Sequence, residues 1–422
     1  MRSENIEQFF SQFDFDIRKS KDARWIDQKC THDVVNIIAD CILEFTQHDT
    51  NKSFTVKDIW LSDYAIENVQ AMFSKPDPSQ QSQNEYDKYF SQPIKLLSYS
   101  RILRAEKIGS RYQYKINNLA LLEHIALKPT NTLNFLISYI QKVLADSGLD
   151  TAFNQFFQIQ NKDAYAQVRK VFIDFTIEHT AINTEVECGR IFTKIVNPLA
   201  FKFKKYGTEK GRISNKIITM QDIQYNRTNW RDDLAGKEKH IPRQEYAGNI
   251  PVESGYSAYL VQKAKKDIRN FNDRFRNGLS EVWQQTEQGI KATQMHHIFP
   301  QSDFPTIAAH LENLIALTPN QHYAMAHPDN KTMYIDKDFQ YICLLAKCGH
   351  IMDNLTNPQV NQQIYDFDSY TFVLDTGLNT DKFSQIDDLD FVSIVLNIDY
   401  FYSEYSNGKF NGLIKNNKPI FK

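Results

Sequence analysis

The segment QMHHIFPQSDFPTIAAHLENLIALTPNQHYAMAHP, residues 294–328, contains five of the eleven histidines in the chain. Two apolar runs with strand character, MHHIF and NLIAL, are followed by PNQHYAMAH, which we expect to form a short helix. Histidine has an ordinary pKa near 6.5 and can serve as a base or a metal ligand near neutral pH. One such residue alone is usually structural, but five in one segment predict a reaction centre.

Three polar elements of this segment occur in a recognisable order. His296 and His297 are followed by an apolar residue, Asn313 lies within ENLIAL, and His322 comes nine residues after that asparagine. This order and spacing resemble the HNH endonuclease motif, which has the ββα-metal nuclease fold. The surrounding chain looks like a restriction endonuclease of that class, although the resemblance covers only about a tenth of the residues.

The resemblance implies a role for each residue of the motif. His297 is the expected general base for the attacking water, and Asn313 is expected to hold the intervening loop through its side-chain amide. His296, on the opposite side of the strand, and His322, on the short helix, are the expected metal ligands. His327 is a weaker ligand candidate, because five residues along an ideal helix turn it about 140° away from His322, whereas a distorted helix end at Pro328 would still bring it in.

The metal follows from the same resemblance. Breaking a phosphodiester requires a cation that neutralises charge on the phosphate, and the family implies Mg²⁺ or Mn²⁺. Many members have Asp where His296 stands, so the nitrogen ligand shifts the preference toward Mn²⁺, Ni²⁺ or Zn²⁺. Many also carry paired CxxC zinc knuckles, which this chain lacks, so its own core or flanking helices must hold the domain. His310 falls in the variable loop and is expected to be exposed rather than catalytic.

The middle of the chain is basic, although the whole protein has a formal charge of −2. Residues 201–280 contain 17 lysines and arginines against 9 acidic residues. Within them KFKKYGTEKGR, residues 202–212, interleaves cations with aromatic residues and glycines, which suits close approach to phosphates. A solvated surface loop is the alternative interpretation. The expected DNA contacts in this stretch are Lys204, Lys205, Lys210 and Arg212.

A second basic pattern follows in KAKKDIRNFNDRFRNG, residues 263–278. It places cations at helical spacings of three, three and seven, which predicts a basic stripe. The residues of this stripe are Lys263, Lys266, Arg269 and Arg276. Residues 351–422 are acidic by contrast, with 10 acids against 5 lysines, so we do not expect them to lie along DNA.

The first part of the chain predicts helices followed by a β-hairpin. RILRAEKIGSRYQYKIN, residues 101–117, alternates apolar and charged residues on both sides of Gly109, which supplies the positive φ of a tight turn. Helices followed by a basic hairpin resemble a winged helix, in which Lys107, Arg111 and Lys115 are candidate phosphate contacts. The alternative is a small α+β module that binds protein and not DNA.

These patterns together predict an α+β fold that is predominantly helical. DSYTFVLDTG, residues 368–377, has strand character, and Pro198 marks an expected boundary. The expected domains are a helical, winged-helix-like module at 1–120, a helical linking domain at 121–200, a basic DNA-contacting region at 201–290, the ββα-metal core at 291–330 and an acidic, helical C-terminal extension at 331–422 that packs on that core.

The composition bounds the class of protein. A hydrophobic share of 41% and an aromatic share of 13% exclude a disordered chain. Five scattered cysteines predict reduced, mostly buried thiols and not a disulfide framework. The first residues do not resemble a signal peptide, and no apolar run is long enough to cross a bilayer. We therefore expect a cytoplasmic protein without membrane insertion.

The leading hypothesis is a site-specific double-stranded DNA endonuclease of the type II restriction class, whose basic region and hairpin module select the target. Such an enzyme implies double-stranded DNA as substrate, a homodimer that cuts both strands, and a cognate DNA methyltransferase. One alternative is a nonspecific or defence nuclease acting on RNA or modified DNA. Another is a DNA-binding regulator whose histidines hold a structural metal.

Overall fold

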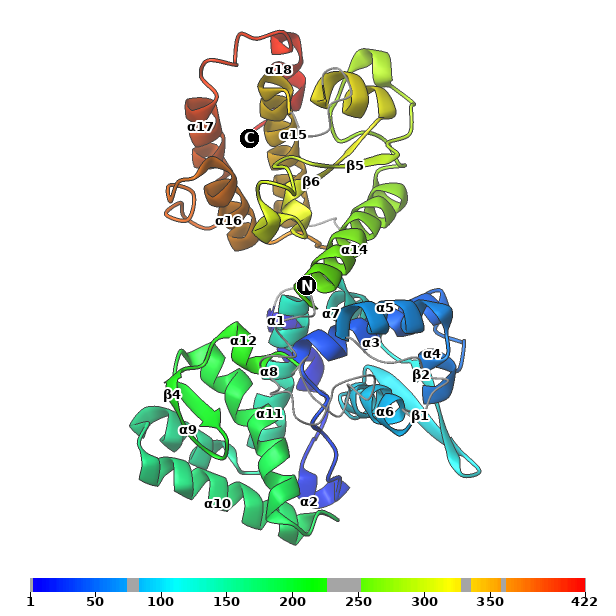
Figure 1. Ribbon diagram of the computed structural model, residues 1–422, viewed down its shortest axis with the longest axis vertical. Helices are drawn as coiled ribbons and strands as arrows, with labels where there is room; N and C mark the ends of the chain where they lie inside the picture. Colours follow the sequence, from blue (N-terminus) through cyan, green and yellow to red (C-terminus); the bar gives the residue numbers. More distant parts are fainter. Residues whose placement is uncertain (1–2, 74–82, 226–251, 328–334, 358–361, 422) are drawn as a thin grey trace, which may run out of the picture. The chain divides into compact units, whose positions relative to one another are not determined.

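The structure is a computed structural model that describes residues 3–73, 83–225, 252–327, 335–357 and 362–421 (Figure 1). These residues form mostly helices, together with three antiparallel sheets of two strands each. The predicted α+β, predominantly helical class is confirmed. The chain divides into two compact units, Met1–Val252 and Glu253–Lys422.

The first unit is built from helices and two hairpins. Its described elements are α1 (Ser3–Phe10), α2 (Ile17–Ser20), α3 (His32–Thr46), α4 (Val56–Trp60), α5 (Asp63–Phe73), α6 (Gln83–Tyr99), β1 (Leu103–Ile108), β2 (Arg111–Ile116), α7 (Leu119–Leu127), α8 (Pro129–Asp146), α9 (Asp150–Ile159), α10 (Lys162–His179), α11 (Glu185–Phe203), β3 (Tyr206–Glu209), β4 (Arg212–Ile217) and α12 (Met220–Ile223).

The core of the first unit is centred on α3, because almost every residue of this helix is buried. Its sequence is apolar around most of its circumference, as expected of an interior helix. Both α7 and α8 pack against it. The buried Asn36 amide of α3 donates to the carbonyls of Ile125 and Ala126 at 2.8 and 3.0 Å. It thereby provides hydrogen bonds to two backbone carbonyls at the C-terminal end of α7.

The hairpin predicted around Gly109 is present as β1 and β2. Gly109 has a φ of +61°, the left-handed conformation that the turn requires. Lys107 and Arg111, on either side of the turn, are exposed. Phe54, which precedes α4, forms an isolated antiparallel bridge with Tyr114 of β2 and joins the hairpin to the helices.

The predicted boundary at Pro198 is wrong, because α11 continues through this proline to Phe203. A proline inside a helix removes one backbone hydrogen bond, and buried neighbours such as Leu199 keep this helix packed. Lys204 ends the helix with a φ of +54°, and the chain turns into the β3–β4 hairpin. The basic stretch 202–212 is therefore a helix end followed by a hairpin.

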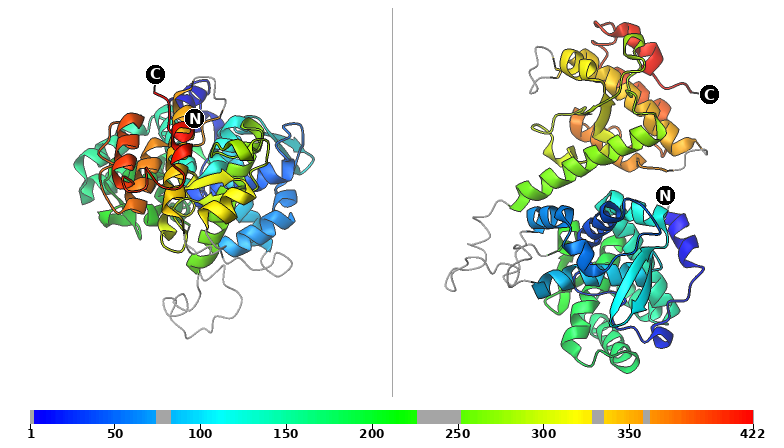
Figure 2. Two further views of the ribbon diagram at one scale, coloured as in Figure 1. Left: turned by 90° about the horizontal axis from the view of Figure 1, so that it is seen from above. Right: turned by 90° about the vertical axis from the view of Figure 1, so that its right-hand side faces the viewer.

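The second unit surrounds the helix α15, which runs through its middle (Figures 1 and 2). Most residues of this helix are buried. The described elements of the unit are α14 (Val252–Phe275), η1 (Gln285–Glu287), β5 (Gln294–His297), η2 (Pro305–Ile307), η3 (Leu311–Asn313), β6 (Leu314–Leu317), η4 (Gln321–Ala326), α15 (Lys337–Thr356), α16 (Phe367–Leu378), α17 (Phe391–Phe401) and α18 (Asn411–Asn417).

The strand expected at residues 368–377 is wrong, because these residues belong to the helix α16. Asp366 caps the helix by accepting a hydrogen bond from the Ser369 amide at 2.9 Å. Phe367, Tyr370 and the following buried residues recur at spacings of three and four, which suits one buried face of a helix.

The predicted basic stripe on α14 is also wrong, because two of its cations are paired within the protein. Lys263 is buried and pairs with Asp267 at 3.1 Å, one helical turn away. Arg276, just after the helix, pairs with Glu281 at 3.0 Å. Of the four stripe residues only Arg269 is exposed. Helical spacing alone does not distinguish a solvated face from internal ion pairs.

The five predicted domains are distributed over the two units. Residues 1–120 and 121–200 lie in the first unit, and 291–330 and 331–422 lie in the second. The basic region 201–290 contributes to both, and its residues 226–251 lie outside the described part of the chain.

Two composition-based expectations can be compared with the structure. All five cysteines are buried thiols that form no disulfide within the described part of the chain, as predicted. Among the described residues, no helix has the length and apolar character that crossing a membrane requires.

Candidate active site

The β5–β6 hairpin places His296 and His297 on opposite faces of one strand. In the antiparallel register His296 is opposite Ile315 and His297 is opposite Leu314. Successive side chains of a strand point to opposite faces, and the surroundings of the two imidazoles differ accordingly. His296 is buried and contacts two further histidines, whereas His297 is half-buried and faces the carbonyl of Ala308.

The short helix after β6, Gln321–Ala326, is a π-helix and not an α-helix. Its hydrogen bonds span five residues, and the last one runs from the His327 amide to the His322 carbonyl at 3.2 Å. This wider turn brings residues five apart toward the same face, whereas an α-helix separates them by about 140°. The objection to His327 as a ligand assumed an α-helix, and the observed geometry removes it.

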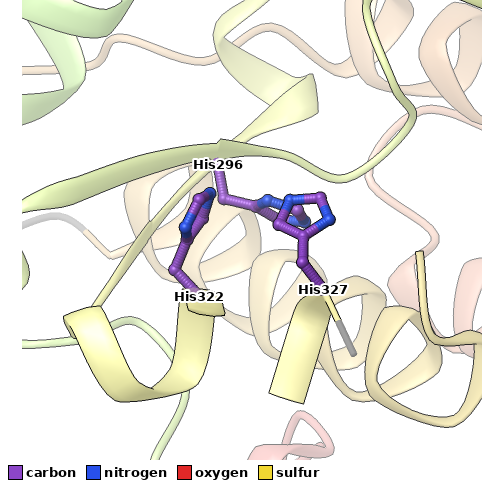
Figure 3. A group of neighbouring side chains, drawn as sticks. All are labelled: His296, His322 and His327. Carbon is purple, nitrogen blue, oxygen red and sulfur yellow. The ribbon is translucent and has the colours of Figure 1, made fainter. Parts of the chain in front are cut away.

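His296, His322 and His327 form what we call the histidine cluster, and their rings converge on one point (Figure 3). One ring nitrogen from each residue lies within 4.8 Å of the other two. The ring centroids are separated by 5.3, 5.0 and 4.8 Å. His296 and His327 are only 4% and 5% exposed, whereas His322 is half-buried, so solvent reaches the cluster beside His322.

Burial favours the neutral form of two imidazoles of the cluster, those of His296 and His322. Burial, followed by the neighbouring histidines, lowers the pKa of His296 well below its usual range. The same two causes lower the pKa of His322 to about 4. The Nδ1 atom of His322 is buried and has no hydrogen-bond partner among the residues that the structure describes. Neutral imidazole nitrogens are good ligands for divalent transition metals, so these residues fit a metal ion.

The second histidine of the strand is oriented by a backbone carbonyl. The Nε2 atom of His297 lies 3.0 Å from the carbonyl oxygen of Ala308. Because a carbonyl can only accept, Nε2 carries the proton of the neutral ring and Nδ1 carries the lone pair. Burial, followed by the charge of Lys265, lowers the pKa of His297 to about 4. The ring is therefore neutral near pH 7, and Nδ1 can accept a proton.

Asn313 is fully buried and bridges the loop between the two strands. Its Oδ1 atom accepts from the Phe299 amide at 2.8 Å, and its Nδ2 atom donates to the carbonyls of Phe299 and Ile307 at 3.0 and 3.3 Å. These bonds hold the loop that carries Ala308. Asn313 thus positions the carbonyl that orients His297.

Lys265 of α14 is a site residue that the sequence reasoning missed. Its charge contributes to lowering the pKa of three of the site histidines, so the ammonium group acts on the whole site. Burial lowers the pKa of Lys265 itself. A signal existed in the sequence, since Lys265 is four residues after Val261 and three before Ile268, both of which are buried. It therefore lies toward the buried face of the helix.

The predicted DNA contacts lie on or beside the two hairpins of the first unit, whereas the histidine cluster belongs to the second unit. Lys205 is half-buried, and its backbone amide donates to the Ala200 carbonyl at 2.9 Å. The exposed members of the predicted set are Lys107, Arg111, Lys115, Lys204, Lys210 and Arg212.

A second buried polar group adjoins β6. The backbone of Glu281 donates to the Ala316 carbonyl at 2.9 Å, and its Oε1 atom accepts from the Ala316 amide at 3.0 Å. Its Oε2 atom pairs with Arg276 at 3.0 Å and with Lys347 at 3.3 Å. Lys347 also donates to the Tyr365 hydroxyl at 2.6 Å. Together with His350, which lies 2.9 Å from the Glu281 carbonyl, these residues form what we call the Glu281 network, Arg276, Glu281, Lys347, His350 and Tyr365.

Comparison with known proteins gives no match, whether with protein-family models, with curated proteins or with solved structures. The function must therefore follow from the chemistry of the residues in the site.

Proposed function

We propose that the protein is a metal-dependent endonuclease that hydrolyses phosphodiester bonds of double-stranded DNA at a ββα-metal, or HNH, centre. The observation that carries the proposal is a single strand bearing two differently placed histidines. His296 joins the histidine cluster, and His297 presents an unprotonated Nδ1 from the other face. The β5–β6 hairpin and the π-helix after it correspond to the two strands and the helix of such a centre.

The histidine cluster would hold the cation. The family resemblance implies Mg²⁺ or Mn²⁺, and three nitrogen donors favour Mn²⁺ or Zn²⁺ among divalent ions. When bound, the cation neutralises the negative charge that develops on the phosphate and on the leaving oxygen. Three protein ligands leave coordination positions open, which is typical of catalytic sites, whereas structural sites are closed by four. This feature favours an enzyme over a regulator with a structural metal.

The remaining site residues act on the proton of the attacking water and on the phosphate. His297 accepts the proton of the attacking water at Nδ1, while the Ala308 carbonyl holds its Nε2–H and fixes the tautomer. Asn313 is a positioning residue, because it acts on His297 only through the loop. Lys265 supplies a positive charge beside the same groups and is suited to bind phosphate oxygens.

The first unit is proposed to select the DNA sequence. α3, the Phe54 bridge, the helices α4 to α6 and the β1–β2 hairpin follow one another in the manner of a winged helix. Lys107 and Arg111 would then contact the DNA backbone beside the hairpin turn. Site specificity, a homodimer and a cognate DNA methyltransferase are further parts of this proposal.

The test is incubation of the full chain with a sequenced plasmid and with its RNA transcript, in EDTA, Mg²⁺ or Mn²⁺, followed by mapping of the ends. The variants are His297→Ala and, as a matched control, His310→Ala. His310 lies in the same segment but outside the cluster, with its ring packed against Phe372 at 5.5 Å between centroids. We expect discrete DNA fragments from the wild type and the control, and about 10²–10⁴-fold slower cutting by His297→Ala.

The other outcomes separate the alternatives. Random DNA ends or cleavage of RNA would indicate a nonspecific nuclease with the same catalytic residues. No cutting by any of the three proteins, together with unfolding of the second unit in EDTA, would indicate a regulator with a structural metal.

A further inference from the structure

A groove runs between the helix α10 and the β3–β4 hairpin in the first unit. Its volume is about 1210 Å³, which exceeds the roughly 300–1,000 Å³ typical of a small-molecule pocket. The lining is partly apolar, through Tyr165, Ala166, Ile173 and Ile213, and otherwise polar or charged. These dimensions suit a segment of a polymer better than one small ligand.

The charges that line the groove are not balanced within the protein. Lys170 and Asp174 form an ion pair and cancel each other. Two acids, Glu185 and Glu209, also line the groove. Four cations that line it make no side-chain hydrogen bond or ion pair among the described residues, and they are Lys162, Arg169, Lys210 and Arg212. An excess of positive charge therefore faces solvent here, which favours an anionic ligand.

The walls of the groove are fixed before any ligand binds. The Asn197 side chain of α11 donates to the Thr208 carbonyl at 3.0 Å and accepts from the Thr208 amide at 2.7 Å. The Tyr165 hydroxyl of α10 is hydrogen-bonded to the Thr208 hydroxyl at 2.6 Å. These contacts join β3 to both helices, so the cations of the hairpin and of α10 are held on opposite sides of one rigid groove.

The tip of the β3–β4 hairpin leaves room for a ligand to approach its backbone closely. Lys210 and Gly211 both have positive φ, and a Cβ placed on Gly211 would meet nothing within 4 Å. On the other wall, Lys162 and Arg169 are seven residues apart, which is about 10.5 Å along the helix axis. Three base-pair steps of a DNA strand rise by about 10 Å. Two cations at this separation along α10 can therefore reach phosphates about three base-pair steps apart.

We propose that this groove binds the sugar-phosphate backbone of duplex DNA, with Lys162 and Arg169 on one wall and Lys210 and Arg212 on the other. The proposal rests on the proposed function, which supplies duplex DNA as the substrate, and it adds two contacts on α10 that charge runs in the sequence do not reveal. Because contacts to phosphates carry no sequence information, the groove holds and orients the DNA and does not read it.

The experiment measures binding and not cleavage. The full chain is titrated with a fluorescent duplex of random sequence in EDTA, over a series of salt concentrations, and binding is followed by anisotropy. The variants are Lys162→Ala, Arg169→Ala and the double variant. Lys19→Ala is the matched control, because it removes one exposed cation that does not line the groove. Arg169→Lys tests whether the charge alone is sufficient.

Each single substitution should weaken binding several-fold and reduce the slope of log K against log salt by about 0.9, and the double variant by about twice that. Lys19→Ala and Arg169→Lys should keep the wild-type slope. Unchanged affinity and slope in the double variant, while the wild type binds, would overturn the groove proposal. Calorimetry with a mononucleotide or inorganic phosphate gives a second test. The groove would hold a small anion, and the proposal would be overturned, if Arg169→Ala no longer bound these ligands but still bound the duplex.

The failure of the groove proposal and the failure of the nuclease proposal give different results. A wild type that binds duplex through the groove but cuts nothing contradicts the proposed function and leaves the groove standing. A wild type that cuts DNA, with a double variant that binds and cuts equally well, contradicts the groove alone.

Discussion

The second unit contains two buried polar groups that adjoin the β5–β6 hairpin, and they differ in where their partners come from. In the Glu281 network each charge meets an opposite charge or a hydrogen-bonding group of the protein, and the side chains of Glu281 and Lys347 are 0% exposed. In the histidine cluster three imidazoles face one another, and the described part of the chain offers no hydrogen-bond partner to the buried Nδ1 of His322.

The pKa values of the two groups express the same difference. Burial by itself would raise the pKa of Glu281, but Lys347 and Arg276 outweigh it and bring the pKa to about 2. At His296 and His322 burial and the neighbouring imidazoles act in the same direction and lower the pKa. A buried polar group that the protein satisfies contributes to the fold, whereas one that it leaves unsatisfied is available to a ligand.

The largest expected effect is on stability, from breaking the network. Lys347→Ala leaves Glu281 buried beside Arg276 alone and should destabilise the second unit by about 3–5 kcal/mol. Urea unfolding of the full chain measures this, with hydrogen exchange of the α15 amides to assign the loss to the second unit. Lys415→Ala, an exposed lysine of the same unit, should be nearly neutral. An equally neutral Lys347→Ala would show that the network does not support the fold.

The next effect is on metal affinity, from breaking the cluster. Removal of a ligand in His322→Ala should weaken binding of Mn²⁺ or Zn²⁺ by about 100-fold, close to 2.7 kcal/mol, with little change in the stability of the metal-free chain. Calorimetry with the metal alone measures the affinity, and His310→Ala is the control. Equal metal affinity in the wild type and in His322→Ala would mean that the cluster is not the metal site.

Local signals made part of the fold predictable. The hairpin around Gly109 follows from alternation and from one turn residue, both of which act over a few positions. The strand prediction for residues 368–377 was wrong because their spacing also fits a helix. The cap at Asp366, together with packing of the apolar face, decides between a strand and a helix. The predicted boundary at Pro198 was wrong because packing of a long helix outweighs one lost hydrogen bond.

The candidate site was predictable only where its residues are close in sequence. The motif pointed to His296, His297, Asn313 and His322, but it left His327 as a weaker candidate, because the π-helix depends on contacts from elsewhere. Gln321 shows why: its Nε2 atom donates to the carbonyl of Val282 at 3.1 Å, and its Oε1 atom accepts from the Thr318 amide at 3.2 Å. Lys265 was missed for the same reason, since α14 meets the hairpin only after folding.

A smaller effect separates the hydrogen bond of the network from its charges. Tyr365→Phe removes the hydroxyl that accepts from Lys347 but keeps the ring, whose centroid is 4.3 Å from the ammonium nitrogen. We expect a loss of about 1.5 kcal/mol in urea unfolding, since the ion pair with Glu281 remains. Tyr400→Phe, at a tyrosine that is 65% exposed, should change nothing. A loss as large as that of Lys347→Ala would indicate that the hydroxyl, and not the ion pair, satisfies the ammonium group.

The smallest effect, taken per pH unit, is the pH dependence that the network confers. The pKa of Glu281 is about 2 in the folded chain against 4.5 ordinarily, so its contribution to stability is complete above pH 4.5 and declines as the pH falls toward 2. The slope is at most about 1.4 kcal/mol per pH unit, because one proton is taken up.

His350 affects the stability at higher pH than Glu281 does. Burial, followed by the charge of Arg276, lowers its pKa from 6.5 to about 4, so stability also declines as the pH falls through that range. The stability of Glu281→Gln should therefore fall less steeply than that of the wild type between pH 4.5 and 2, by the share of one proton, whereas the exposed-site control Glu404→Gln should keep the wild-type slope. If both variants kept the wild-type slope, Glu281 would not be the carboxylate that the network holds ionised, and the contrast with the histidine cluster would rest on hydrogen bonding alone.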